Sequence, residues 1–209
     1  MIRSISKQTA VMMGKQLEAD DDRTDILAYG LEIIIGGTVK FLLVIFLAYI
    51  LDIFQTVLIS VLSFVAFRHF GGGVHLSTYP RCLSIGLLLF LGLGKLAESN
   101  MSANIITLLM GLTLILGAYV IIRWVPAGTH NKNVSDQALR LGQKKKMTIV
   151  LIGWTIITSI LIQHQLRYSL ALILGAVSSF FFITPWGYRV LHTLDHIFNT
   201  VKEGRKKDD

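Results

Sequence analysis

Six apolar runs constrain this chain more than any other feature of its sequence. They cover residues 31–51, 54–70, 82–98, 104–124, 147–164 and 168–185. A helix needs about 20 apolar residues to cross the hydrocarbon core of a bilayer. Of the 209 residues, 53% are hydrophobic and only 16% are charged, which argues against an ordinary soluble domain. We therefore predict an all-α polytopic membrane bundle of about six transmembrane helices.

Lysine and arginine positions orient the predicted spans. Of the 20 lysines and arginines, 17 fall in segments that alternate onto one side of a six-span chain. The positive-inside rule places that side, with both termini, in the cytoplasm. Runs 54–70 and 82–98 are short, since 17 residues of helix cover only ~25 Å. Four spans with two re-entrant segments would keep the same sidedness.

We expect a single integral membrane domain over residues 1–209. Residues 1–28 form a cytoplasmic amphipathic segment, residues 29–185 the bundle, and residues 186–209 a basic cytoplasmic tail with one apolar helical stripe. Such a tail suits the surface of the lipid bilayer. The net charge of +7 is divided among segments separated by apolar spans, so we expect no nucleic-acid partner.

The stretch FRHFGGGVHLSTYPRC, residues 67–82, interrupts the apolar pattern and holds the only cysteine. Pro80 favours a helix start, which makes Cys82 the third residue of the next helix. A thiolate there meets the positive end of the helix dipole, and Arg68, Arg81 and His75 lie nearby in the sequence. Three consecutive glycines permit a sharp turn or the close approach of another backbone. This pattern fits a cysteine nucleophile with a histidine that carries the proton.

Plainer interpretations remain open for these residues. The stretch could be a glycine-rich turn between two spans of a transporter. A zinc site formed by His69, His75 and Cys82 lacks a fourth protein ligand nearby, and His192 with His196 lacks a third. We therefore expect no metal and no other cofactor.

The sequence resembles the accessory gene regulator B family, AgrB, of bacterial quorum sensing. The resemblance is carried by RHFGGGVHLSTYPRC, by the lysine-bearing segment at residues 125–146, and by residues 29–54. It implies a membrane-embedded cysteine endopeptidase with Cys82 as nucleophile and His75 as base. The substrate would be an AgrD-like propeptide, from which the enzyme removes the C-terminal tail. The remaining segment would close into a thiolactone or lactone ring. The resemblance also favours a homodimer.

Further site residues are weighed beside this pair. Arg68, Gly72 and Gly73 match motif positions and would support or orient the site. Glu32 could orient His75, or could simply sit among the lipid headgroups. For an acidic propeptide tail, charge pairing predicts binding by a set of basic residues: Arg81, Lys144, Lys145 and Lys146.

Two competing functional classes make different predictions. A small transporter would keep its function after Cys82→Ala, whereas a cysteine peptidase would lose it. A hydrolytic membrane protease would release a linear carboxylate instead of a ring.

Overall fold

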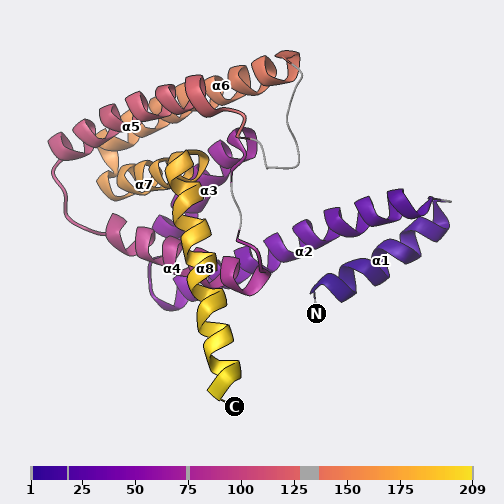
Figure 1. Cartoon of the computed structure of the whole chain (residues 1–209). Coiled ribbons are helices and arrows are strands. Elements are labelled where there is room, and N and C mark those ends of the chain that lie inside the picture. The colour runs from indigo at the N-terminus through magenta and orange to yellow at the C-terminus, as the bar shows by residue number, and fades with distance from the viewer. Residues whose placement is uncertain (1, 18, 74–75, 128–136, 209) are drawn as a thin grey trace. The chain divides into compact units, whose positions relative to one another are not determined.

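The computed structural model describes residues 2–17, 19–73, 76–127 and 137–208, and these residues fold almost entirely into helices (Figure 1). In chain order the helices are α1 Ile2–Gln16, α2 Asp21–Ile50, α3 Phe54–Gly71, α4 Tyr79–Ala97, α5 Ala103–Trp124, α6 Gln137–His164, α7 Leu166–Ile183 and α8 Pro185–Asp208. Six of them, α2 to α7, are long and apolar enough to cross a membrane. The predicted all-α bundle with about six spans is confirmed.

Two of the described helices start well before their apolar runs. Helix α2 begins at Asp21 and α6 at Gln137, about ten residues before the runs at 31–51 and 147–164. Polar residues continue both helices, because helix formation needs backbone hydrogen bonds and not an apolar surface. Asp20 caps α2, since its carboxylate accepts the Arg23 N–H at 2.8 Å.

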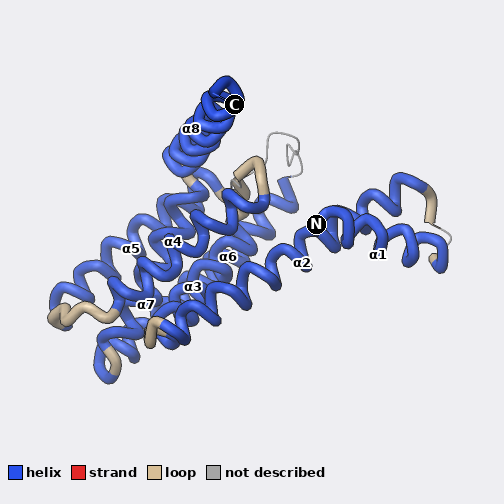
Figure 2. Tube along the Cα trace, turned by 90° about the horizontal axis from the view of Figure 1, so that it is seen from below, coloured by secondary structure: helices blue, strands red, loops and turns tan. Residues whose placement is uncertain are grey.

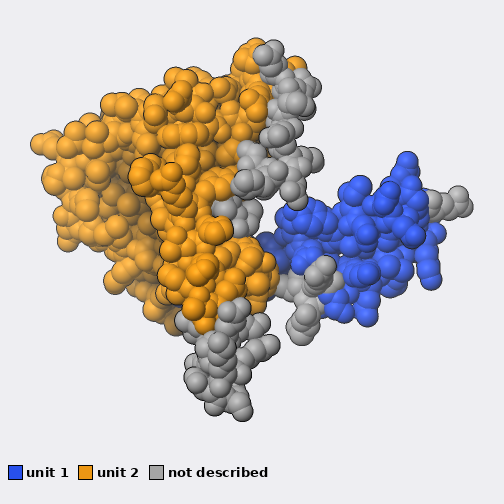
Figure 3. Space-filling view, in the orientation of Figure 1, with its two compact units in different colours: residues 1–47 blue, residues 48–209 orange. Residues whose placement is uncertain are grey.

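The chain divides into two compact units, residues 1–47 and residues 48–209 (Figure 3). The first unit holds α1 and most of α2. Ser6 and Ala10 of α1 are fully buried, and a Cβ at Gly14 would press against the Thr24 hydroxyl of α2. Close packing of α1 on α2 therefore depends on a glycine. A single domain over the whole chain stays a prediction.

Helix α7 forms the centre of the second unit. It contacts α3, α4, α5 and α6, and half of its most apolar stretch is buried, more than in any other candidate span. In lipid, apolar surface alone does not drive helices together, so close approach and hydrogen bonding become decisive. The contact between α3 and α7 shows both effects.

Helices α3 and α7 approach closely through small residues. The Ser60 hydroxyl donates to the Ala171 carbonyl at 3.1 Å, and the Ser63 hydroxyl donates to the Leu172 carbonyl at 2.7 Å. A Cβ at Gly175 would collide with the Ser60 carbonyl oxygen. Two serines and one glycine thus bring the two backbones together and satisfy the hydroxyls inside the bundle.

An aromatic cluster joins this pair to the neighbouring helices. The ring of Phe67 lies 4.7 Å from that of Phe180 and 6.1 Å from that of Trp154, measured between centroids. Both phenylalanines are fully buried. Trp154 of α6 also donates its indole N–H to the Leu172 carbonyl at 3.3 Å. The cluster holds the ends of α3 and α7 in a fixed relation.

Helix α8 runs across the direction of α5 and α6 in Figure 1, and in Figure 2, turned by 90°, it is seen foreshortened. A tight elbow after α7 sets this direction. The Thr184 hydroxyl donates to the Phe181 carbonyl at 2.7 Å, and the Gly187 N–H donates to the Thr184 hydroxyl at 3.4 Å. A Cβ at Gly187 would strike the Phe181 carbonyl. The amphipathic helix predicted for the tail is thus present and is anchored at its first turn.

We predict that Gly175→Ala weakens the bundle. The added methyl group must push the α3 backbone away, and overpacking of this kind costs about 1–3 kcal/mol. Gly153→Ala is the matched control, because a Cβ at Gly153 on α6 meets nothing within 4 Å. The midpoint of thermal unfolding in detergent should fall for Gly175→Ala and stay at or above the wild-type value for Gly153→Ala. Equal midpoints for the two variants would contradict the close approach.

Candidate functional site

Cys82 lies in the first turn of α4 and is half-buried. The backbone of Thr78 is extended, with φ −128° and ψ 144°, and the helix begins at Tyr79 with Pro80 in its first turn. The Cys82 N–H donates to the Thr78 carbonyl at 3.1 Å. Cys82 is therefore the fourth helical residue, one later than predicted, because Tyr79 already has helical geometry. The expected place beside the helix start is confirmed.

Two glycines end α3 with backbone geometry that other residues rarely adopt. Gly72 has a φ of 73° and Gly73 a φ of 124°. The Ala127 N–H donates to the Gly71 carbonyl at 2.8 Å, and Gly72 forms an isolated parallel bridge with Ala127. A Cβ at Gly72 would meet the Ala127 carbonyl oxygen. The predicted sharp turn and close backbone approach are both present, and they join the ends of α3 and α5.

The Arg68 side chain occupies the space beside Gly73. Its guanidinium donates to the Phe182 carbonyl of α7 at 3.2 Å and lies where a Cβ of Gly73 would be. Arg68 is also close enough to Cys82 for their charges to interact. The structure thus brings together three residues that the sequence singled out: Arg68, Gly73 and Cys82.

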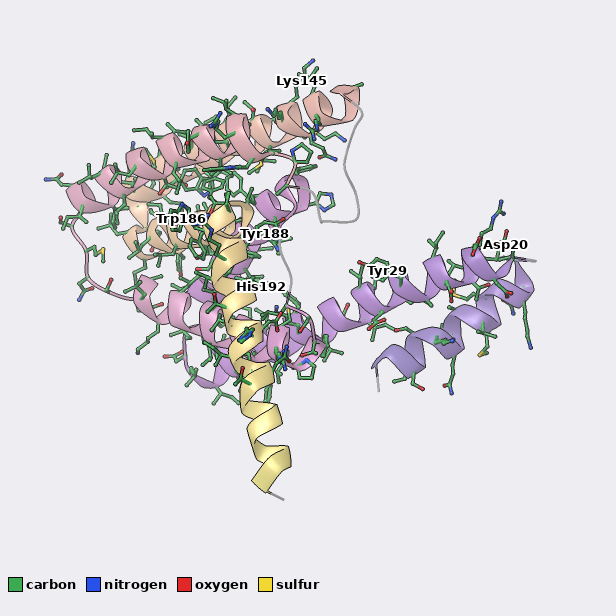
Figure 4. The ribbon with its side chains drawn as sticks, viewed as in Figure 1. Asp20, Tyr29, Lys145, Trp186, Tyr188 and His192 are labelled. Carbon is green, nitrogen blue, oxygen red and sulfur yellow. The ribbon has the colours of Figure 1, made fainter. Side chains whose placement is uncertain are left out.

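Tyr188 of α8 approaches the same arginine. Burial raises the pKa of the Tyr188 hydroxyl, and the positive charge of Arg68 acts in the opposite direction. Figure 4 labels this tyrosine near the start of α8. The start of α8 therefore lies at the same end of the bundle as Cys82, hereafter the Cys82 end.

Two of the predicted site residues are not placed beside Cys82. His75 lies outside the described residues. Glu32 belongs to the unit of residues 1–47, whereas Cys82 belongs to the other unit. Their roles as base and as orienting carboxylate stay predictions.

A second helix contacts the start of α4 through Asp195. Its carboxylate accepts the Ser77 backbone N–H at 2.8 Å and the Ser77 hydroxyl at 2.9 Å. It also pairs with Arg81 at 3.1 Å, and the other guanidinium nitrogen of Arg81 donates to the Asn199 side chain at 2.7 Å. We call these four residues, Ser77, Arg81, Asp195 and Asn199, the Asp195 network. Arg81, which the sequence suggested as a residue that binds the propeptide tail, is thus hydrogen-bonded to Asp195 and Asn199 of the chain itself.

A basic pocket of about 430 Å³ opens near these elements, between the end of α5, the start of α6 and the elbow of α8. Three cationic residues line it: Arg123, Arg140 and Lys144. The lining residues that the structure describes include no aspartate or glutamate. The Lys144 ammonium donates to the Ile122 carbonyl at 2.8 Å, which satisfies one of the open carbonyls at the end of α5. Lys145, labelled in Figure 4, and Lys146 are exposed and do not line the pocket.

Metal ligation finds no support in the part of the chain that the structure describes. There, no three His, Cys, Asp or Glu side chains gather closely enough to hold an ion. The chemistry available is that of one thiol near a guanidinium, at the start of a helix, beside a pocket of positive charge.

Comparison with known proteins gives a family match for this chain. The model of the family described as AgrB, accessory gene regulator B, matches residues 6–183. This chain belongs to the AgrB family. Two AgrB-like proteins of Clostridium perfringens, from strain SM101 and strain 13, are each 24% identical to it. Each match covers 95% of this chain and 99% of the relative. No solved structure matches the chain significantly.

Sequence reasoning about this AgrB protein missed two features at the Cys82 end. One is Asp195, and the other is the pair of pocket arginines, Arg123 and Arg140. Asp195 had a usable signal, because it is the only acidic residue between positions 137 and 202. The pocket had none, since its residues come from three segments that only the fold brings together.

We predict that Asp195 of this AgrB protein titrates below the ordinary carboxyl value of about 3.9. Partial burial favours the neutral acid, but the Ser77 and Arg81 hydrogen bonds outweigh it and lower the pKa. A lowered pKa means that the contribution of Asp195 to stability is present above the ordinary value and is lost as pH falls through the folded value. Carbon-13 NMR of the labelled side chain should show this midpoint.

Arg81→Gln should move the Asp195 midpoint upward, because it removes both the ion pair and a hydrogen bond. Arg189→Gln is the matched control, since the Arg189 guanidinium lies over the Trp186 ring, 5.2 Å from its centroid. An Asp195 midpoint above the ordinary value in the wild type would contradict the network.

Proposed function

We propose that the protein is a membrane cysteine endopeptidase that removes the C-terminal tail of an AgrD-like propeptide and closes the remaining segment into a thiolactone or lactone ring. The observation that carries the proposal is the placement of Cys82. The only thiol of the chain lies in the first turn of a helix, half-buried, within charge range of Arg68. Membership of the AgrB family and the role of accessory gene regulation agree with it.

The first chemical step is attack by the Cys82 thiolate on the scissile carbonyl carbon. The carbonyl π electrons move to oxygen, and backbone N–H groups at the helix start could stabilise that oxyanion. His75 takes the thiol proton and delivers it to the departing nitrogen. The C–N bond breaks, the tail leaves as an amine, and the core peptide stays bound to Cys82 as a thioester. His75 carries this role as an expectation from the sequence.

The second step exchanges one thioester for another. A cysteine thiol of the propeptide gives its proton to His75 and attacks the thioester carbonyl. The Cys82–carbonyl bond breaks, a thiolactone ring forms, and Cys82 recovers its proton. With a serine in the propeptide, the same exchange gives a lactone. A site shielded from water protects the thioester from hydrolysis to a linear acid.

Arg68 supports this chemistry through its fixed position. Its guanidinium is tied to the Phe182 carbonyl and has Gly73 beside it, so its charge stays near Cys82. Fixed positive charge near a reacting centre stabilises negative charge that develops there in the transition state. We infer that Arg68 acts on the thiol and not on the substrate tail.

The acidic tail of the propeptide has a suitable partner in the basic pocket. Three cationic residues of the described chain line it, Arg123, Arg140 and Lys144. Lys145 and Lys146 stand on the same helix and add positive charge around it. Charge complementarity of this kind guides and orients a substrate. The basic residues also favour a cytoplasmic location for this face.

Mass spectrometry of the protein in lipid vesicles with its candidate propeptide tests the proposal. The wild type should release the tail and carry a propeptide adduct on Cys82 that hydroxylamine removes. Cys82→Ala should insert normally, release no tail and carry no adduct. Tail release by Cys82→Ala at the wild-type rate would end the nucleophile claim. A linear acid in place of a ring would identify a simple hydrolase.

We predict that Arg123→Gln combined with Arg140→Gln raises KM for an acidic tail. An exposed charge pair contributes about 0.2–1 kcal/mol, so losing two should raise KM about two- to thirtyfold. The change should fade at high salt, because mobile ions screen such pairs.

Two controls accompany this double variant. Lys95→Gln removes a positive charge in the last turn of α4, opposite the helix start that carries Cys82, and should leave KM unchanged. A propeptide whose tail acids are replaced by amides should bind wild type and double variant equally. If the double variant handled both tails as the wild type does, the pocket would have no part in tail binding.

A further inference from the structure

We propose that Asp195 of α8 is a positioning residue for the catalytic turn, acting on Cys82 through Ser77 and Arg81. The inference rests on the proposed function, because it assumes that Cys82 is the nucleophile. It concerns a helix that the motif residues do not include, and it assigns to α8 a part in the reaction beyond contact with lipid.

The start of α4 depends on a partner from outside the helix. The N-cap Thr78 makes no side-chain capping hydrogen bond. The carboxylate of Asp195 instead accepts hydrogen bonds from the backbone N–H and the hydroxyl of Ser77, which lies 118 residues away in the chain. A negative charge near a helix N-terminus is also favoured by the helix dipole. The turn that carries Cys82 therefore takes its support from α8.

Arg81 extends this support into the helix itself. Its guanidinium contacts the Asp195 carboxylate at 3.1 Å, the Asp195 backbone carbonyl at 3.4 Å and the Ser77 hydroxyl at 3.3 Å. It also lies over the Phe198 ring, 5.4 Å from the centroid. The side chains of Arg81 and Asp195 are only 15% and 18% exposed. A shielded, multiply bonded pair fixes geometry better than a solvated one.

Cys82 follows Arg81 directly, so the network fixes the backbone on which the thiol stands. Ser77 and Arg81 bracket the turn from Thr78 to Tyr79, and Cys82 bonds back to Thr78 at 3.1 Å. A displacement of about 1 Å in a reacting group can lower a rate about a hundredfold. Loss of the network should therefore slow the chemical step and leave substrate binding largely intact.

One face of α8 carries these contacts. At about 100° per residue, Tyr188, Asp195 and Asn199 fall within about 40° of one another. Tyr188 lies within charge range of Arg68, and Asp195 binds Arg81, so α8 contacts residues at both ends of the connection between α3 and α4. The elbow at Gly187 anchors the helix that makes both contacts.

The opposite face of α8 is apolar and exposed. It consists of Trp186, Val190 and Ile197, which are 65%, 44% and 52% exposed. This face suits lipid, and the polar face suits the bundle. The polar face of α8 therefore contacts the bundle and positions the start of α4, whereas the apolar face is available to lipid.

Steady-state kinetics of tail release test the inference with Asp195→Asn, Arg81→Gln and the double variant. Each single variant should lower kcat about ten- to a hundredfold with KM within about threefold of wild type. The double variant should fall no further than the worse single one, because both changes break one unit. Asp195→Glu should recover part of the loss. His196→Gln, next to Asp195 and exposed, should keep the wild-type kcat.

A tail-binding role for Arg81 would give a different pattern. Arg81→Gln would then raise KM, and Asp195→Asn, which releases the arginine, would lower KM. That pattern would overturn the positioning role. Wild-type kcat and KM in both single variants, with Cys82→Ala inactive, would also overturn it and leave the proposed function intact.

A readout without peptide keeps the two claims separate. Cys82 is the only thiol, so N-ethylmaleimide reports on it alone. Breaking the network should expose this half-buried thiol and raise its labelling rate about threefold or more, together with faster hydrogen exchange at residues 76–82. If Cys82→Ala still released the tail, the proposed function would fail. The positioning claim would then depend on this rate, and an unchanged rate would overturn it.

Discussion

The structure depends on the close contact between α3 and α7. Between lipid-facing helices the hydrophobic effect gives little net attraction, so association relies on packing and on polar groups that find partners inside the bundle. Ser60 and Ser63 donate to carbonyls of α7, and Gly175 leaves room for the Ser60 carbonyl. An interface made of leucines would be solvated by lipid as well as by another helix, so it would not favour the pairing of α3 with α7 over other pairings.

The contact between these helices determines the geometry of the site. Because α3 and α7 are held together, the Phe182 carbonyl near the end of α7 can accept a hydrogen bond from the Arg68 guanidinium near the end of α3. The same end of α7 turns through Thr184 and Gly187 into α8. One helix end therefore places a cation beside Cys82 and also directs the helix that carries Asp195. The position of Cys82 relative to its surroundings follows from packing deep in the bundle.

Much of the fold could be predicted from the sequence, and less of the site. The six spans followed from apolar length, since lipid requires nearly all backbone groups to bond within their own segment. The start of α4 near Pro80 and the turn at Gly72 and Gly73 followed from local backbone preferences. The role of Asp195 could not be predicted, because its partner Ser77 lies 118 residues away in the chain and a sequence pattern does not indicate a contact over that distance. The same limit applies to Arg123 and Arg140, which meet at one pocket only after α5, α6 and α7 have packed.

Charge at the Cys82 end is divided between two arrangements. In the Asp195 network, each charge has its opposite within the chain, so the network is electrically neutral and its effect is geometric. In the basic pocket, the described lining residues include three cationic ones, Arg123, Arg140 and Lys144, so positive charge is concentrated there. A carboxylate placed loosely near that pocket would compete with an acidic substrate for the same cations. Asp195 is held on Arg81 and is not among the described residues that line the pocket. Positioning and attraction can therefore operate side by side without one weakening the other.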